Sequence, residues 1–154
     1  MRKYLVAAAG IAMIASANGA FAASATSNFN VRVTVNAACT VSATDMTFGP
    51  YSGSIPAGAT ATSTASVSCN NGTSYALSFS TGAGPGNAVG TATANMVNPA
   101  PGANPIPASL TVAVAPKTAT GGVDNTTING TITAGVTNPV VGTYTVAQAL
   151  YVLY

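Results

Sequence analysis

The clearest alternation of apolar and polar side chains runs from Phe29 to Val41, in the stretch FNVRVTVNAACTV. Every odd position there is apolar or cysteine, and every even position except Ala38 is polar. Such alternation predicts a β-strand with one buried face. The stretch would span roughly 43 Å, whereas strands of globular domains usually have about 3–10 residues. It therefore either bends near Asn36, or its two halves pair with different partners.

The two halves of this stretch differ in how they can be held. The second half contains Cys39, which can tie it to the body of the domain. The first half, residues 29–35, has no such tie. We therefore expect the second half to belong to the domain's own sheet and the first half to be free of it.

Two more strands are predicted further along the chain. Residues 61–69 alternate, and their inner face consists of small or apolar side chains: Ala61, Ser63, Ala65, Val67 and Cys69. The sequence Asn-Asn-Gly-Thr at 70–73 is a typical hairpin signal. Residues 74–80 then present Tyr75, Leu77 and Phe79 on one face. We expect these two strands to form a hairpin.

The segments around them are rich in glycine and proline. Residues 42–60 predict turns, and residues 81–108 predict long edge loops with at most a weak strand at 92–97, because proline cannot serve a central ladder. A linker between two domains is disfavoured, since neither side alone has enough strands for a core. Residues 110–114 predict a strand that ends before Pro116. Residues 127–132 predict either a hairpin at Asn129-Gly130 or one strand with a glycine kink.

The stretch 140–154 is apolar on both faces of a predicted strand. One face contains Tyr144, Val146, Leu150, Val152 and Tyr154. The other face contains Tyr151 and Leu153. The β-branched and aromatic residues favour a strand over a helix. Such a strand is usually buried on both faces, yet no later strand in this sequence covers it.

The first residues resemble a secretory signal. Arg2 and Lys3 precede an apolar run at 4–15, and Ala20-Phe21-Ala22 fits the cleavage pattern. A transmembrane anchor is disfavoured, because spanning requires about 20 apolar residues. We predict cleavage after Ala22 and a single domain at residues 23–154.

Charge is scarce throughout the chain. Charged residues are 4% of the sequence, against about 25% in ordinary soluble domains. After removal of the signal, Arg32 and Lys117 balance Asp45 and Asp124. A nearly uncharged surface favours association. No basic patch is present, so we expect no nucleic-acid partner.

The two cysteines, Cys39 and Cys69, are predicted to form a disulfide, because the chain is predicted to be exported. For a closed loop of about 31 residues, the chain-entropy estimate is about 3.7 kcal/mol of stabilisation. Two cysteines without histidine do not make a thiolate metal site. The alternative is a pair of buried thiols.

The sequence contains few of the residue types that support catalysis. It contains no histidine and no glutamate, and its two aspartates are far apart. A serine, cysteine or threonine nucleophile needs an adjacent base. No glycine-rich phosphate loop precedes a helix. We therefore expect no catalytic residue, no cofactor and no metal site.

Several of these patches together resemble the spore coat protein U domain family, which includes subunits of archaic chaperone-usher pili. They are FNVRVTVNAACTV, Thr47-Phe48-Gly49, VSCNNGTSYALSFSTG, INGTITAG and VGTYT with Gly142 and Tyr144. VNAACTV also resembles the first-cysteine region of ordinary fimbrial subunits. The sequence departs from the family in its middle: Met96 and LTVAV stand near an expected Arg-x-Met patch and Leu-x-Tyr strand. Thr145 or Val146 stands where an acidic residue is usual.

The resemblance implies an all-β, immunoglobulin-like sandwich that lacks its last strand. It also implies that a periplasmic chaperone fills the open groove first, and that an outer-membrane usher exchanges it for the N-terminal segment of the next subunit. Residues 23–35 have the form of that donor segment, with plugs at Phe29, Val31, Val33 and Val35. The groove and chaperone strand would contain Tyr144, Val146, Leu150, Val152 and Tyr154.

The function implied is that of a structural subunit of a surface pilus, a homopolymer exported through the periplasm for attachment and biofilm formation. The alternative is a self-complemented secreted coat or adhesin-type binding domain. A tip adhesin usually has an additional receptor-binding domain, for which residues 23–154 leave no room.

Overall fold

The computed structural model describes residues 24–154, so the predicted signal peptide at 1–22 lies outside the described residues. The chain divides into two units, residues 1–34 and residues 35–154. Residues 24–38 contain no regular secondary structure. No helix within residues 24–154 is long and apolar enough to cross a membrane.

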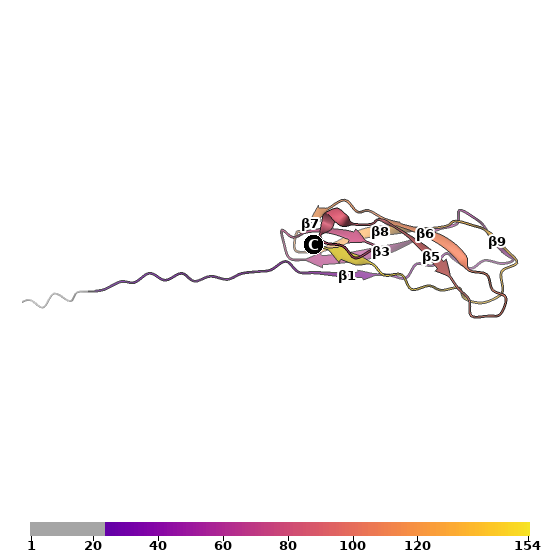
Figure 1. Ribbon diagram of the computed structural model, residues 1–154, viewed down its shortest axis with the longest axis horizontal. Coiled ribbons are helices and arrows are strands. Elements are labelled where there is room, and N and C mark those ends of the chain that lie inside the picture. The colour runs from indigo at the N-terminus through magenta and orange to yellow at the C-terminus, as the bar shows by residue number, and fades with distance from the viewer. Residues whose placement is uncertain (1–23) are drawn as a thin grey trace, which may run out of the picture. The chain divides into compact units, whose positions relative to one another are not determined.

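The second unit is built from antiparallel strands (Figure 1). A five-stranded sheet has the order β1 (Cys39–Ala43), β3 (Thr60–Cys69), β8 (Val123–Ile132), β6 (Ile106–Val112) and β5 (Thr91–Met96). A three-stranded sheet has the order β10 (Tyr151–Leu153), β4 (Ser74–Ser78) and β7 (Lys117–Thr118). A short ribbon pairs β2 (Ser54–Ile55) with β9 (Val136–Thr137), and a 3-10 turn, η1 (Pro85–Asn87), follows β4.

The core lies between the five-stranded and three-stranded sheets. Val67 of β3 and Ile128 of β8 are buried, and both pack in one cluster with Tyr75 and Leu77 of β4. Burial of these side chains against each other is the main force holding two such layers together. The described part of the chain is therefore all-β, with an immunoglobulin-like sandwich of curled antiparallel sheets, as predicted.

The disulfide prediction is confirmed. Cys39 and Cys69 face each other in the register of β1 and β3 and are bridged. The second half of the alternating N-terminal stretch therefore belongs to the domain's own sheet, as expected. The first half, residues 29–35, forms no strand.

The predicted hairpin between β3 and β4 is wrong, although the turn is present. Gly72 has φ +82°, and the Thr73 N–H donates to the Asn70 carbonyl at 3.1 Å. The two strands that flank the turn belong to different sheets. Both strands carry an apolar inner face, so crossing between the layers lets both faces meet in the core.

The long edge loop expected up to residue 108 is also wrong at its end. Strand β6 starts at Ile106, contains Pro107 and lies between β5 and β8. Pro107 is only the second residue of the strand, and its carbonyl accepts a hydrogen bond from the Thr133 N–H at 3.0 Å. Proline is tolerated close to a strand's start because the lost N–H falls where the ladder begins. The weak strand expected at 92–97 is the regular strand β5.

Of the two alternatives for residues 127–132, the single strand is correct. Strand β8 runs through Gly130 and pairs with β3 on one side and β6 on the other. The closing stretch is less regular than expected. Only Tyr151–Leu153 forms a strand, and Thr145 makes one isolated bridge with Val97.

Candidate functional site: an open groove

A groove of about 900 Å³ lies between two irregular segments of the domain. The first wall runs from Ala43, the last residue of β1, to Ile55 of β2, and the second wall is residues 139–150, which precede β10. The floor comes mainly from the inner face of the five-stranded sheet, with Phe79 beside it. The floor residues are Ser63, Ala94, Met96, Ile106, Ala108, Leu110, Ile128 and Ile132.

Small residues at the centre of this floor leave space above the five-stranded sheet. Ala94 and Ala108 are buried there, and Gly130 follows on β8. A Cβ on Gly130 would collide with the Met46 sulfur and would lie 2.8 Å from Phe48 Cζ. Two side chains of the first wall therefore lie directly over the backbone of β8. The close approach explains why glycine is placed inside a strand.

Each wall contains a stretch without backbone partners among the described residues. Within residues 24–154, no backbone-to-backbone hydrogen bond involves residues 45–52 or residues 146–150. Strands β1 and β10, which continue these walls, each pair on one side only among the described strands. Unpaired N–H and C=O groups along an edge are a template for another strand. The groove thus combines an apolar floor with two wall segments that have free hydrogen-bonding capacity.

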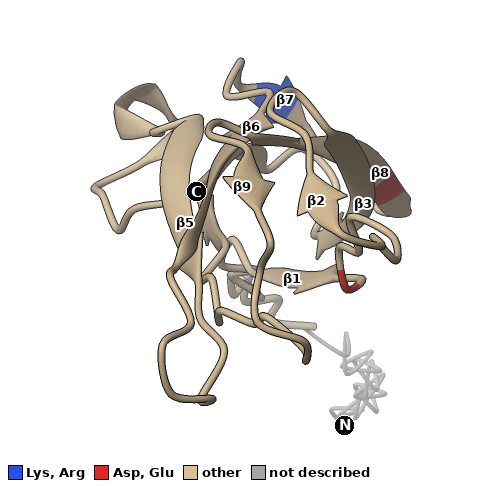
Figure 2. Ribbon diagram, turned by 90° about the vertical axis from the view of Figure 1, so that its right-hand side faces the viewer, with Lys and Arg blue, Asp and Glu red and all other residues tan. Residues whose placement is uncertain are grey.

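One end of the groove is closed by the ribbon of β2 and β9, which lie side by side in Figure 2. Ser54 pairs with Thr137, and the Asn138 N–H donates to the Gly53 carbonyl at 3.0 Å. The two walls are therefore joined at this end. Nearby, Ile55, Ile106 and Ile132 form a buried cluster against which Tyr144 packs.

The residues predicted for the C-terminal strand are distributed over three environments. Tyr144, Val146 and Leu150 line the groove. Val152 lies in β10 opposite Leu77 and packs against the sandwich core instead. Tyr154 follows β10 and is exposed.

The residues predicted as plugs are all in solvent. Phe29 is 84% exposed, Val31 84%, Val33 89% and Val35 77%. Large apolar side chains with so much exposed surface in succession are unusual for a folded soluble chain. Together they make one strand-length segment with an unburied apolar face.

Sequence reasoning did not find most residues that build the groove. Met46, Phe48 and Ile55 lie in the turn-rich segment, where only Thr47-Phe48-Gly49 stood out. The apolar residues Met46 and Phe48 share a parity and are partly buried. This short alternation was the signal available.

Charge is confined to a few positions of the domain, as Figure 2 shows. Asp45 is the groove's single charged lining residue among the described ones. Lys117 on β7 and Asp124 on β8 form an ion pair at 3.4 Å.

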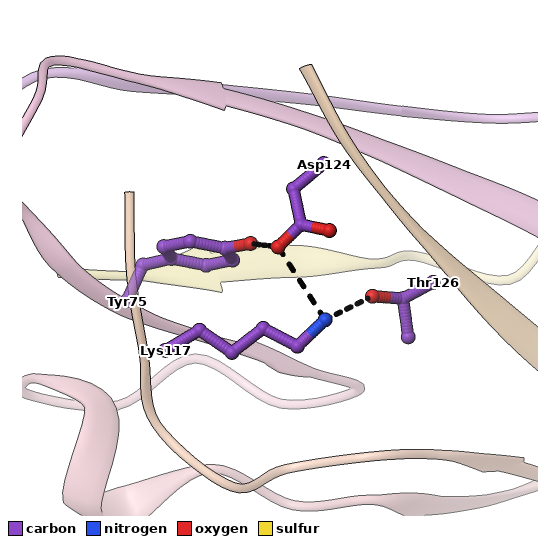
Figure 3. A network of polar contacts seen from close by, with 4 residues as sticks. All are labelled: Tyr75, Lys117, Asp124 and Thr126. Atoms are coloured by element: carbon purple, nitrogen blue, oxygen red, sulfur yellow. Dashed lines mark hydrogen bonds and ion pairs between the residues drawn. The ribbon is translucent and has the colours of Figure 1, made fainter. Parts of the chain in front are cut away.

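This ion pair belongs to a network that links the two sheets (Figure 3). The buried Tyr75 hydroxyl of β4 donates to Asp124, and Lys117 Nζ also donates to Thr126 Oγ1 at 3.1 Å. The hydrogen bond from Tyr75 lowers the pKa of Asp124, and the nearby Lys117 ammonium lowers that pKa too. Burial, together with the Asp124 carboxylate, raises the pKa of Tyr75 to about 12. The network links the two sheets through polar contacts, and none of its four residues lines the groove.

Comparison with known proteins gives one match. The family model of the Spore Coat Protein U domain matches residues 25–147. No curated protein and no solved structure shows significant similarity to the chain. The matched range includes the exposed segment 29–35, the cysteine pair and most of both groove walls.

Proposed function

Since this chain belongs to the spore coat protein U domain family, we propose that it is a structural subunit of a chaperone-usher surface pilus. The observation that carries the proposal is a groove with an apolar floor and two wall stretches, 45–52 and 146–150, that have no backbone partner among the described residues. Such a groove is the acceptor that β-augmentation requires, because an inserted strand gains ladder hydrogen bonds and side-chain pockets together. The fibre would serve attachment to surfaces and biofilm formation.

The donor in this proposal is the segment with Phe29, Val31, Val33 and Val35, supplied by a neighbouring copy. Their alternation aims all four side chains at one face of an extended strand. Burying four such side chains at about 1.5–3 kcal/mol each would stabilise the joint by about 6–12 kcal/mol before ordering costs. Their present exposure of 77–89% means that nearly all of this surface is available for burial.

Before assembly, the same groove would be filled by a periplasmic chaperone, and an outer-membrane usher would carry out the exchange. This route includes export through the periplasm to the cell surface and a homopolymer as the product. The proposed role involves no catalysis, since the sequence contains no histidine or glutamate and the groove lining has one charged residue among those described.

The test uses Val33→Asp, which would place an unpaired charge at a central plug, where burial is costly. The matched control is Arg32→Ser, which lies on the opposite parity. Both are co-expressed with the cognate chaperone and usher, and heat-resistant ladders are read on gels. We expect Val33→Asp to abolish the ladder while its chaperone-bound monomer persists, and Arg32→Ser to polymerise.

Two results would overturn the donor assignment. One is polymerisation of Val33→Asp at the parental level. The other is loss of its chaperone-bound monomer, since Val33 would then belong to the subunit's own core. A parent that yields only soluble monomers, without fibres in electron micrographs, would favour the self-complemented coat or adhesin-type domain.

A further inference from the structure

The second wall of the groove is hydrogen-bonded to Val97, the residue after β5, just before the wall's own unpaired stretch at 146–150. Val97 and Thr145 exchange two backbone hydrogen bonds, each of 3.0 Å. Asn98 follows Val97, and its side chain contributes two more contacts. Its Nδ2 donates to the Val140 carbonyl at 3.5 Å, and its Oδ1 accepts from the Ala100 N–H at 3.0 Å. One amide thus links the turn after β5 to the wall.

Gly142 makes room for this contact. Its φ of +144° lies where side chains are rarely tolerated, and an added Cβ would lie 2.6 Å from Asn98 Nδ2. The Asn98 amide therefore rests against the bare backbone of the wall. Tyr144 supports the same point, because its hydroxyl donates to the Val140 carbonyl at 3.2 Å. Its ring meanwhile packs on the isoleucine cluster at the closed end of the groove.

Beyond Thr145, the wall has no backbone partner within residues 24–154 until β10 begins at Tyr151. Its position along the groove is therefore set by what holds each end. At the β10 end the hold is a regular strand. At the other end it is the bridge to Val97 and the Asn98 contact. The bridge uses backbone atoms, and the Tyr144 side chain also lines the groove. The Asn98 side chain is therefore the contact that substitution can remove without changing the groove lining.

We infer that Asn98 is a positioning residue of the groove, which presets the wall at residues 139–150 so that an inserted strand can pair with the unpaired stretch 146–150. The inference rests on the proposed function. A wall fixed before binding need not be ordered during binding, which lowers the cost of association. Loosening the wall should act mainly on the dissociation of the inserted strand, as most changes within an interface do.

The experiment compares Asn98→Asp with Asn95→Asp. Aspartate at 98 keeps the acceptor for the Ala100 N–H but faces the Val140 carbonyl with an oxygen instead of a donor. Asn95 lies three residues earlier on β5, is exposed, and takes the same change of charge. Both variants are made in mature chains that also carry Val33→Asp, so that self-donation is suppressed. The probe is a fluorescent peptide with the sequence of residues 24–36.

We expect the peptide to dissociate about tenfold faster from Asn98→Asp, as the loss of one part-buried hydrogen bond predicts, and within about twofold of the parental rate from Asn95→Asp. Gly142→Ala, which displaces the Asn98 side chain, should act in the same direction. Hydrogen exchange without peptide should quicken at residues 139–150 of Asn98→Asp and stay unchanged in β3 and β8. A merely structural role would instead speed exchange throughout the domain.

The outcomes separate the two proposals. If the parent binds the peptide and Asn98→Asp releases it at the parental rate, the positioning role is wrong while the groove's function stands. If the parent does not bind the peptide, the proposed function fails and the positioning role with it. If Asn98→Asp does not fold, Asn98→Ser takes its place, since serine keeps a short acceptor but cannot reach Val140. Parental exchange rates at residues 139–150 of that variant would overturn the inference.

Discussion

Tyr75 shows what a single hydroxyl contributes in a domain with almost no charge. Its ring fills the core between the sheets, while its hydroxyl reaches the carboxylate of Asp124 (Figure 3). Packing and polar contact therefore come from different atoms of the same residue. Tyr75→Phe removes the hydroxyl and keeps the ring.

We expect Tyr75→Phe to lower the free energy of unfolding at pH 7 by about 1 kcal/mol. The loss is limited because Asp124 is partly exposed and water replaces some of the lost donor. Urea unfolding of the purified mature protein measures the difference. A variant as stable as the parent would show that the hydroxyl adds no stability beyond that given by the packing of the ring.

The same pair makes this difference depend on pH. The pKa of Asp124 is lowered, so its contribution is present above the unfolded-state pKa of about 3.9 and is lost as the pH falls through the folded pKa. The pKa of Tyr75 is raised to about 12, so its contribution is present below about pH 10 and decreases as the pH rises toward 12. The parent and Tyr75→Phe should therefore differ most near neutrality. Equal differences at pH 3, 7 and 10.5 would contradict this assignment.

Single residues were predictable where their chemistry is local. The disulfide followed from two cysteines on predicted inner faces in a chain with a secretory signal. Asn98 was not predictable, because its partners at Val140 and Gly142 lie in another irregular segment. No periodicity in the sequence connects them.

Strand β8 is the element on which the groove depends most. It lies in the middle of the five-stranded sheet, and its residues Ile128 and Ile132 belong to the groove floor. Gly130 between them leaves space for Met46 and Phe48 of the first wall. Strand β8 thus determines both the depth of the groove above the sheet and the position of the first wall.

Gly130→Val should fill this space and displace Met46 and Phe48 into the groove. Overpacking of this kind typically costs about 1–3 kcal/mol, so the strand-rich circular dichroism spectrum should persist while the yield of polymer drops strongly. The control is Asn129→Val, which adds the same side chain on the exposed face of β8. If Gly130→Val gave the parental yield of heat-resistant ladder, the groove would tolerate a larger side chain at position 130.

At the scale of elements, the sequence pattern predicted strands better than their partners. Alternation at 61–69 and 74–80 located β3 and β4, but the turn between them gave no sign that the chain changes sheet. Pro107 argued against a central strand, and only its place near the start of β6 explains why it is tolerated. Pairing depends on contacts between distant segments, which local patterns do not encode.

The domain as a whole combines a closed core with an unfilled groove. Alternation and composition predicted the all-β sandwich, because both report on burial. The groove could be predicted only as a missing strand, because its walls at 45–52 and 146–150 are irregular and its floor draws on strands far apart in sequence. Arg32, Lys117, Asp45 and Asp124 are the only charged residues of the described range, so little repulsion opposes contact between copies.

The disulfide between Cys39 and Cys69 lies near the point where a pulling force on the donor segment of the proposed fibre would reach the domain. It connects β1, an edge strand of five residues, to the ten-residue β3. The segment with the exposed apolar residues 29–35 precedes β1 by three residues, so in the proposed fibre force on the donor is transmitted toward β1. Without the bridge, a short edge strand and the hydrogen bonds from Asn70 to the Ala38 and Asn36 carbonyls would resist that force.

Reduction of the bridge should therefore lower the free energy of unfolding by about 2–4 kcal/mol, mainly because the unfolded chain regains conformational freedom. The same parental protein, with and without reductant, is compared by urea unfolding, so that no side chain is replaced in the core. Hydrogen exchange of the reduced form should quicken first in residues 39–43, because β1 is held on one side only. Equal unfolding midpoints, or exchange that quickens uniformly across β3 and β8, would mean that β1 is held by its ladder and packing rather than by the bridge.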